Sequence, residues 1–125
     1  MDENQLSHIV IGKAIKIHKE LGPGLLEGVY KECLAMSLEK EGLKVEREKM
    51  LPVYFEDIKL TSAFRVDLLV DGKLLIELKS VNEIHDIHMA QTINYLRLGN
   101  LKLGLLINFN VILLKDGIRR VVNKL

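Results

Sequence analysis

The chain has 125 residues, of which 48% are apolar and 28% charged, and its formal net charge is +1. This size and composition are typical of a single globular domain, here residues 1–125, with one hydrophobic core. The near-neutral charge argues against a large non-specific nucleic-acid surface, but it is compatible with a local basic rim. The apolar runs are too short to span a bilayer, and the first residues lack the profile of a signal peptide. A single cysteine, Cys33, cannot form an internal disulfide, so we expect a cytoplasmic protein.

Two amphipathic helices are predicted at the start of the chain. Apolar residues at three- and four-residue spacing indicate the first, over residues 4–21: Leu6, Ile9, Val10, Ala14, Ile17 and Leu21. The stretch Gly22–Gly24 should end this helix, because glycine caps helix C-termini and the intervening proline cannot continue it. A second helix is expected over residues 26–41, and Gly42 closes it.

The rest of the chain reads mainly as strands. We expect strands over residues 50–55, 62–70, 73–80 and 102–109, a helix over residues 85–98, and a last hairpin made of 111–115 and 118–122. Pro52 should place the first strand at an edge or at a bulge. The order of two helices, three strands, one helix and three strands indicates an α/β fold with a mixed sheet.

The strand LLIELKS, residues 74–80, carries Glu77 and Lys79 in the most hydrophobic strand pattern of the chain. Charged groups are costly to desolvate unless they pair or bind a ligand. Side chains alternate along a strand, so these two point to one face. Asp67 of the preceding strand shares that face only if the Asp71-Gly72 turn has an odd-length loop or a bulge, which is what we predict.

Two carboxylates and a lysine on one sheet face are suited to metal-assisted phosphoryl chemistry. Oxygen ligands of this type favour Mg²⁺ or Mn²⁺. The metal would polarise a phosphoryl oxygen, and Lys79 would hold a water or stabilise negative charge. A solvated sheet face with an ordinary Glu77–Lys79 pair is the alternative interpretation.

The predicted third helix places His88, Gln91 and Tyr95 on one narrow stripe, where they could orient a phosphate or a water. An ordinary solvent face with a half-buried tyrosine is the alternative. The spacing of His85 and His88 also fits a structural zinc pair, although no cysteine or third histidine element lies near them in the sequence.

Near the start of the second helix, GLLEGVY places Glu27 and Tyr30 one turn apart. An acid in a first turn complements the helix dipole, and a tyrosine can simply pack. The functional interpretation is that Glu27 faces the same cleft as Asp67 and Glu77.

These stretches together resemble a known family. GLLEGVY is similar to the signature of the GxxExxY proteins, while FRVDLLV, LIELKS and QTINY resemble the Asp, Glu-x-Lys and Gln-x-x-x-Tyr elements of the PD-(D/E)XK nuclease superfamily. One departure is that RVD stands where the superfamily name has Pro-Asp. The resemblance implies a restriction-endonuclease-like core, a mixed β-sheet flanked by helices, and Mg²⁺-dependent (or Mn²⁺-dependent) cleavage of nucleic acid, with DNA favoured over RNA.

The resemblance also implies a role for each matching residue. Asp67 and Glu77 would be metal ligands, Glu27 a further ligand or water-orienting acid, and Lys79 the water-activating group. Gln91 and Tyr95 would support the site. These six residues form the predicted catalytic set: Glu27, Asp67, Glu77, Lys79, Gln91 and Tyr95.

Two alternatives to a nuclease remain open. A non-catalytic module could use the same fold to bind nucleic acid or protein, although an aromatic content of 5% offers few stacking surfaces. A small-substrate phosphohydrolase would be the other, but no Gly-rich phosphate loop is present. We expect no membrane association and allow for a homodimer or a protein partner. Candidate residues for a basic rim are Arg47, Lys49, Arg65, Lys102, Arg119 and Arg120.

Overall fold

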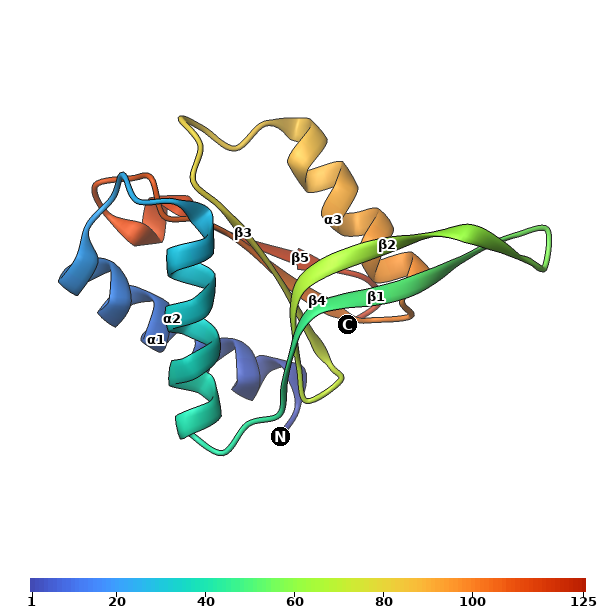
Figure 1. Cartoon of the computed structure of the whole chain (residues 1–125), viewed down its shortest axis with the longest axis horizontal. Coiled ribbons are helices and arrows are strands. Elements are labelled where there is room, and N and C mark those ends of the chain that lie inside the picture. The colour runs from blue at the N-terminus through green and yellow to red at the C-terminus, as the bar shows by residue number, and fades with distance from the viewer.

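Three helices and a five-stranded sheet make up the computed structural model, which describes residues 1–125 (Figure 1). The elements in chain order are α1 (Glu3–Leu21), α2 (Glu27–Lys40), β1 (Val45–Phe55), β2 (Ile58–Val70), β3 (Leu74–Lys79), α3 (Asp86–Leu98), β4 (Leu103–Asn108), the 3₁₀ helix η1 (Leu114–Gly117) and β5 (Ile118–Val122). The expected helices are all present. Helix α1 ends at Leu21, before the predicted Gly22–Gly24 stop, and Gly22 adopts φ 71°.

The sheet is mixed and follows the chain in the order β1-β2-β3-β4-β5. Only β3 and β4 are parallel, and helix α3 connects them; the other neighbours are antiparallel. This confirms the predicted α/β architecture of a mixed sheet flanked by helices. The expected effect of Pro52 is also confirmed, because β1 is an edge strand and its register with β2 shifts between Pro52 and Tyr54.

The turn between β2 and β3 has the predicted odd length. Val70 pairs with Leu74, so three residues, 71–73, form the loop. Asp71 and Gly72 both adopt positive φ angles, of 51° and 66°. With this register Leu68 pairs with Ile76, and the next opposed residues are Asp67 and Glu77.

The prediction of a strand over residues 111–115 is wrong. This segment leaves the sheet and crosses to α1, where Nε2 of His18 donates a hydrogen bond to the carbonyl of Val111 at 2.7 Å. Leu114 then enters the core as part of η1. Gly117 packs so closely on the Asn108 carbonyl that a Cβ would lie 2.1 Å from that oxygen. The partner of β5 is therefore β4 itself.

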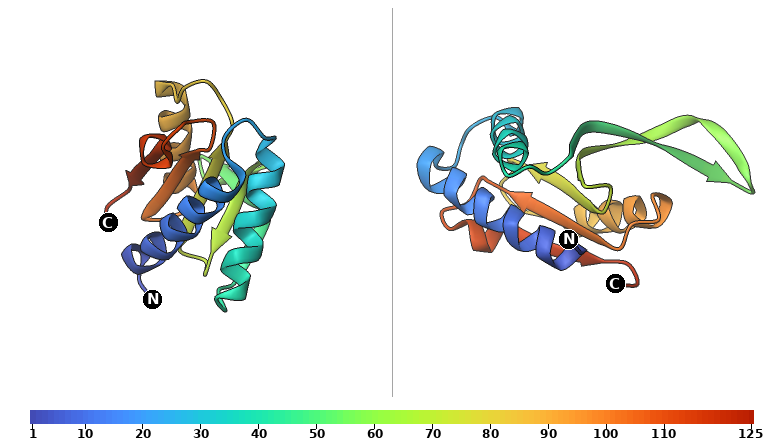
Figure 2. Two further views of the ribbon diagram at one scale, coloured as in Figure 1. Left: turned by 90° about the vertical axis from the view of Figure 1, so that its left-hand side faces the viewer. Right: turned by 90° about the horizontal axis from the view of Figure 1, so that it is seen from below.

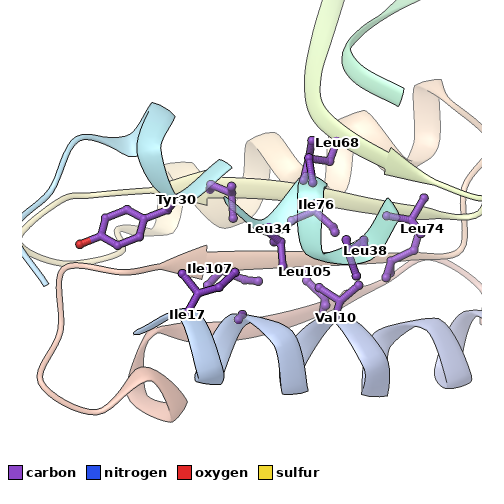
Figure 3. Packing of buried hydrophobic residues seen from close by; sticks show 14 of the residues in the cluster. Val10, Ile17, Tyr30, Leu34, Leu38, Leu68, Leu74, Ile76, Leu105 and Ile107 are labelled. Atoms are coloured by element: carbon purple, nitrogen blue, oxygen red, sulfur yellow. The ribbon is translucent and has the colours of Figure 1, made fainter. Parts of the chain in front are cut away.

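The sheet separates two apolar layers. Helices α1 and α2 cover one face and α3 the other, as the two views of Figure 2 show. Figure 3 shows the larger cluster, in which leucines of α2 meet Leu68, Ile76 and Leu105 of the sheet. Full burial of each such side chain contributes about 1.5–3 kcal/mol. Strand β3 divides its residues as predicted, with Leu74, Ile76 and Leu78 facing α1 and α2 and Leu75 facing α3.

The hairpin of β1 and β2 extends beyond the sheet as an arm (Figure 1). A two-residue turn closes it, and both turn residues, Glu56 and Asp57, have positive φ angles. Apolar side chains near the tip are exposed: Tyr54, Phe55, Ile58 and Leu60. None of the helices of the chain is both long and apolar enough to cross a membrane.

Candidate active site

Asp67 and Glu77 lie face to face where β2 and β3 part. The ladder of paired residues ends at Leu68 and Ile76, and β2 continues into the arm (Figure 1). Beyond that point the two strands are joined by hydrogen bonds from backbone N–H groups to the side chains of Asp67 and Glu77. The Asp67 N–H donates to Glu77 Oε1 at 3.0 Å, and the Leu78 N–H donates to Asp67 Oδ2 at 2.8 Å. Each carboxylate is thereby fixed by the strand that carries the other.

This pair is buried and electrostatically unfavourable. Asp67 is 9% exposed and Glu77 only 7%. Burial, followed by the charge of Asp67, raises the pKa of Glu77 to about 8. Two adjacent carboxylates that resist ionising together form a site that a cation would stabilise.

Lys79 follows on the same face of β3, two residues after Glu77. Its side chain is half-buried, and its ammonium makes neither a hydrogen bond nor an ion pair. Lys79 nevertheless lies close enough to lower the pKa values of Glu27 and Glu77, against the larger effects of burial and of Asp67. An unpaired ammonium beside buried carboxylates is available to a ligand.

Helix α2 brings a third predicted acid towards the pair. Glu27 is the first residue of the helix and is half-buried. Burial and then the charge of Asp67 raise the pKa of Glu27, while Lys79 and Lys31 oppose the rise. Glu27 therefore faces the same cluster as the strand-borne residues, as its position in GLLEGVY predicted.

Tyr30 explains how α2 is held in place. Its hydroxyl donates to the Gly22 carbonyl at 2.6 Å and accepts from the Leu25 N–H at 3.1 Å. Its buried ring stacks on Phe109 with 4.3 Å between ring centroids. The loop before Glu27 is also bound by Ser80, whose Oγ donates to the Leu25 carbonyl at 2.8 Å. Tyr30 thus acts structurally, fixing the segment that presents Glu27.

Sequence reasoning missed two charged residues of the cluster, Lys31 and Glu48. The Lys31 ammonium hydrogen-bonds to Glu48 and lies 3.4 Å from Asp67 Oδ1. Although burial disfavours this ammonium, its bonds to Glu48 and the two carboxylate charges raise the pKa of Lys31. The spacing of four residues from Glu27 was the available signal for Lys31, because such residues share one helix face.

Glu48 comes from β1 and lies opposite Asp67 in the β1–β2 register, between the pairs Arg47–Leu68 and Lys49–Val66. It adopts a φ of 51°, which is uncommon for a residue with a side chain. Its Oε2 lies 2.9 Å from Nε of Arg65 in an ion pair without hydrogen-bond geometry. Sequence analysis did not single out Glu48, because its position opposite Asp67 follows only from the register of β1 against β2.

Helix α3 contributes one residue to the cluster and leaves another outside. Burial, then the charges of Glu77 and Asp67, raise the pKa of Tyr95, and its ring stacks on Phe64 at 4.7 Å. Gln91 is exposed and makes no hydrogen bond. His85 and His88 cap the helix instead of forming a metal pair, because the His85 N–H donates to Nδ1 of His88 at 2.9 Å.

The donor set suits a hard divalent cation, but it is not a complete cage. No three Asp, Glu, His or Cys side chains converge closely enough to hold an ion by themselves. The carboxylates of Asp67 and Glu77 supply the oxygen ligands that Mg²⁺ and Mn²⁺ favour, and Mg²⁺ commonly binds through one or two carboxylates while keeping several waters. The residues therefore fit such an ion, and Glu27 lies beside the carboxylate pair, where it lines the adjoining pocket.

An open pocket of about 420 Å³ adjoins the cluster. Its lining combines the loop before α2 and the first residue of α2 with residues that follow β3 and β4: Gly24, Leu25, Leu26, Glu27, Ser80 and Asn110. A second pocket of about 370 Å³ lies between α1 and the segment before η1, and none of the clustered acids lines it. The pocket beside Glu27 is the one that could admit a ligand to the charged cluster.

The chain is similar to a known protein family. The model of the PD-(D/E)XK nuclease superfamily matches residues 4–121, which includes every residue of the cluster. No curated protein and no solved structure matches the chain. The mixed five-stranded sheet flanked by three helices is consistent with the restriction-endonuclease-like fold of that superfamily.

Proposed function

The chain belongs to the PD-(D/E)XK nuclease superfamily, and we propose on that basis that it is a metal-dependent nuclease that hydrolyses phosphodiester bonds, with DNA as its favoured substrate. The observation that carries the proposal is the buried pair of Asp67 and Glu77 with the unpaired Lys79 on the same sheet face. A structural ion pair would not leave this lysine without a partner. A site built for an anionic substrate would.

Each predicted residue has a role in this proposal. Asp67 and Glu77 would hold Mg²⁺ or Mn²⁺, and Glu27 would act as a further ligand or orient a water. When bound, the ion supplies Lewis-acid polarisation of a phosphoryl oxygen. Lys79 holds the attacking water or stabilises the negative charge that develops on the phosphate. Tyr95 supports the carboxylates from α3, and Gln91 would join it only on contact with substrate, because its side chain is exposed.

We also assign the chain to the GxxExxY group within the superfamily, on the stretch GLLEGVY. The geometry supports this assignment, because the two motif residues have complementary tasks. Glu27 faces the carboxylate pair, and Tyr30 binds the loop that precedes it. A helix-borne acid is thereby fixed against a strand-borne pair.

The charge of the cluster indicates how the substrate is accepted. Three basic residues, Lys31, Arg65 and Lys79, accompany the four acids Glu27, Glu48, Asp67 and Glu77. Carboxylates repel phosphate unless a cation neutralises them. Substrate binding should therefore depend on the divalent ion, which agrees with a formal net charge of only +1.

A nuclease assay tests the proposal. Purified protein would be incubated with single- and double-stranded DNA and RNA in Mg²⁺, Mn²⁺ or EDTA, beside Lys79→Met and the matched control Lys40→Met. Lys40 lies at the opposite end of α2, is exposed and makes no ion pair. We expect metal-dependent cleavage that Lys79→Met lowers by at least 100-fold and Lys40→Met leaves unchanged.

A non-catalytic module is the second candidate, favoured by the observation that no three acids converge into a ready-made ion site. Folded wild-type protein that neither cleaves any of the four substrates nor binds Mn²⁺ would establish this reading and overturn the nuclease. Equal activity of wild type and Lys79→Met would show that any cleavage arises from a contaminant or from another site.

A further inference from the structure

The oxygens of the carboxylate pair are unequally engaged. Backbone N–H groups of the opposite strand use Oε1 of Glu77 and Oδ2 of Asp67. The second oxygen of Asp67, Oδ1, faces the Lys31 ammonium at 3.4 Å. A carboxylate oxygen that accepts no backbone hydrogen bond is the more available donor for a divalent ion. On Asp67, that oxygen is the one that Lys31 contacts.

Lys31 is also firmly held. Its ammonium hydrogen-bonds to Glu48, and Glu48 is in turn paired with Arg65. The Lys31 side chain is 20% exposed and that of Asp67 12%, so both charges are largely shielded from water. Charge-assisted bonds of this kind are stronger than neutral ones and persist in partly buried surroundings.

We propose that Lys31 is a tethered counter-cation, which contacts Oδ1 of Asp67 in the metal-free protein and leaves that oxygen when a divalent ion binds. This inference rests on the proposed metal-dependent function. Lys31 balances the charge of Asp67 in the absence of metal, and Glu48 retains the ammonium when it leaves Asp67. Lys31 is a positioning residue in this scheme, because it sets the starting state of the site and does not touch the reacting atoms.

The proposal makes metal binding a competition between two cations for one oxygen. Contacts that exist only in the metal-free state lower the apparent affinity for the ion, in the same way that a minor binding-competent population does. Removing the Lys31 ammonium should therefore tighten metal binding. Any variant that removes a positive charge nearby will tighten it to some extent, so Lys79→Met, which removes an ammonium that does not contact Asp67, is the matched control.

The test compares Mn²⁺ dissociation constants of wild type, Lys31→Met and Lys79→Met, measured by electron paramagnetic resonance. We expect the Lys31→Met constant to be about tenfold lower than wild type, and lower than that of Lys79→Met, since one charge-assisted bond is lost only from the metal-free state. Equal tightening by both variants would overturn the inference. Absence of Mn²⁺ binding to the wild type would instead overturn the proposed function, so the two failures are distinguishable.

Thermal unfolding tests directly whether the metal ion displaces the Lys31 ammonium from Asp67. Because the bond from Lys31 to Glu48 is kept when metal binds, Lys31→Met should melt below the wild type in both conditions, but the difference should be smaller in saturating Mg²⁺ than in EDTA. An equal difference in the two conditions would show that Lys31 stays on Asp67. Lysine ¹⁵N–¹H spectra of the wild type cover the case in which the variant does not fold. The Lys31 ammonium signal should change on adding Mg²⁺, and an unchanged signal would contradict the inference.

Discussion

Asp67 and Glu77 bind each other's strands: the Glu77 carboxylate accepts from the Asp67 N–H, and the Asp67 carboxylate accepts from the N–H of Leu78, the next residue along β3. Where the backbone pairing of β2 and β3 ends, the carboxylates of these two acids therefore accept the hydrogen bonds that hold the strands together. The same two side chains thus stabilise the fold and are the proposed metal ligands. Substitutions that keep the hydrogen bond but remove the negative charge can separate these two roles.

Asp67→Ala and Asp67→Asn should differ sharply in stability. Alanine leaves the buried Leu78 N–H without an acceptor, which costs about 1–3 kcal/mol of unfolding free energy. Asparagine keeps an acceptor oxygen and should cost less than about 1 kcal/mol. Urea unfolding in EDTA measures both. Both variants should lose Mn²⁺ binding, because neither retains the carboxylate. An equal loss of stability in the two would contradict the hydrogen bond to Leu78.

The metal-free protein should lose stability as pH rises from about 5 to 8. The pKa of Glu77 is raised to about 8 in the folded state, so the folded protein binds a proton that the unfolded chain releases near pH 4.5. Stability therefore falls with pH throughout this window. Urea unfolding in EDTA at pH 5.5, 7 and 8.5 measures the slope.

Glu77→Gln is the control for the pH effect. It removes the titrating group while retaining an amide oxygen for the Asp67 N–H, so the slope between pH 5.5 and 8.5 should flatten. The lowered pKa of Glu48 acts below pH 4.5 and does not enter this window, whereas the raised pKa of Glu27 adds a slope of the same sign that remains in Glu77→Gln. A wild-type slope identical to that of Glu77→Gln would show that Glu77 is ionised in the folded protein.

Tyr30→Phe should destabilise the protein by about 1–2 kcal/mol. The variant keeps the ring stacked on Phe109 but loses the hydroxyl that bonds Gly22 and Leu25, leaving two partners to find water. Tyr95→Phe is the matched comparison, because the Tyr95 hydroxyl makes no hydrogen bond and its loss should change stability by less than about 0.5 kcal/mol. Chemical denaturation distinguishes them, and the reverse order would refute the structural assignment of Tyr30.

Gly117→Ala should be among the most damaging alanine substitutions. Its methyl group would lie 2.1 Å from the Asn108 carbonyl oxygen, a backbone atom that cannot move without disturbing β4. We expect a loss above about 2 kcal/mol. Gly12→Ala in α1 meets nothing within 4 Å and should stabilise the helix by up to about 1 kcal/mol. Melting temperatures that move in these opposite directions would verify the packing at Gly117.

Local patterns predicted most of the elements. Gly22 ended α1, Pro52 marked an edge strand with a register shift, and the turn at Asp71 had the odd length that brings Asp67 opposite Glu77. Each of these depends on residues close together in the chain. The failure at residues 111–115 has a different cause. Five apolar or long side chains in a row suggested a strand, but a hydrogen bond from His18, 93 residues earlier, draws the segment onto α1.

The candidate site divides in the same way. Asp67, Glu77 and Lys79 could be grouped from the alternation of two neighbouring strands, and Glu27 and Tyr95 from motif resemblance. Lys31 had only a partial signal, its four-residue spacing from Glu27. Its contacts with Asp67 and Glu48 follow only once α2 and β1 are placed in space. For Gln91 the helical spacing correctly placed it on the same helix as Tyr95, but it did not predict contact with the cluster, because the Gln91 side chain is exposed.

The short loop between β2 and β3 also bears on the order of folding events. Asp67 and Glu77 are ten residues apart, whereas Lys31 is 36 residues from Asp67. Hairpins form within about 1–10 μs, before distant segments meet. Asp67 and Glu77 therefore come together before Lys31 is in place to balance their charge. Like charges directly opposite each other destabilise strand pairing. Refolding should accelerate as pH falls towards 4.5, where a carboxyl group of the unfolded chain takes up a proton, because a proton on one acid removes the repulsion at the step where the hairpin first forms.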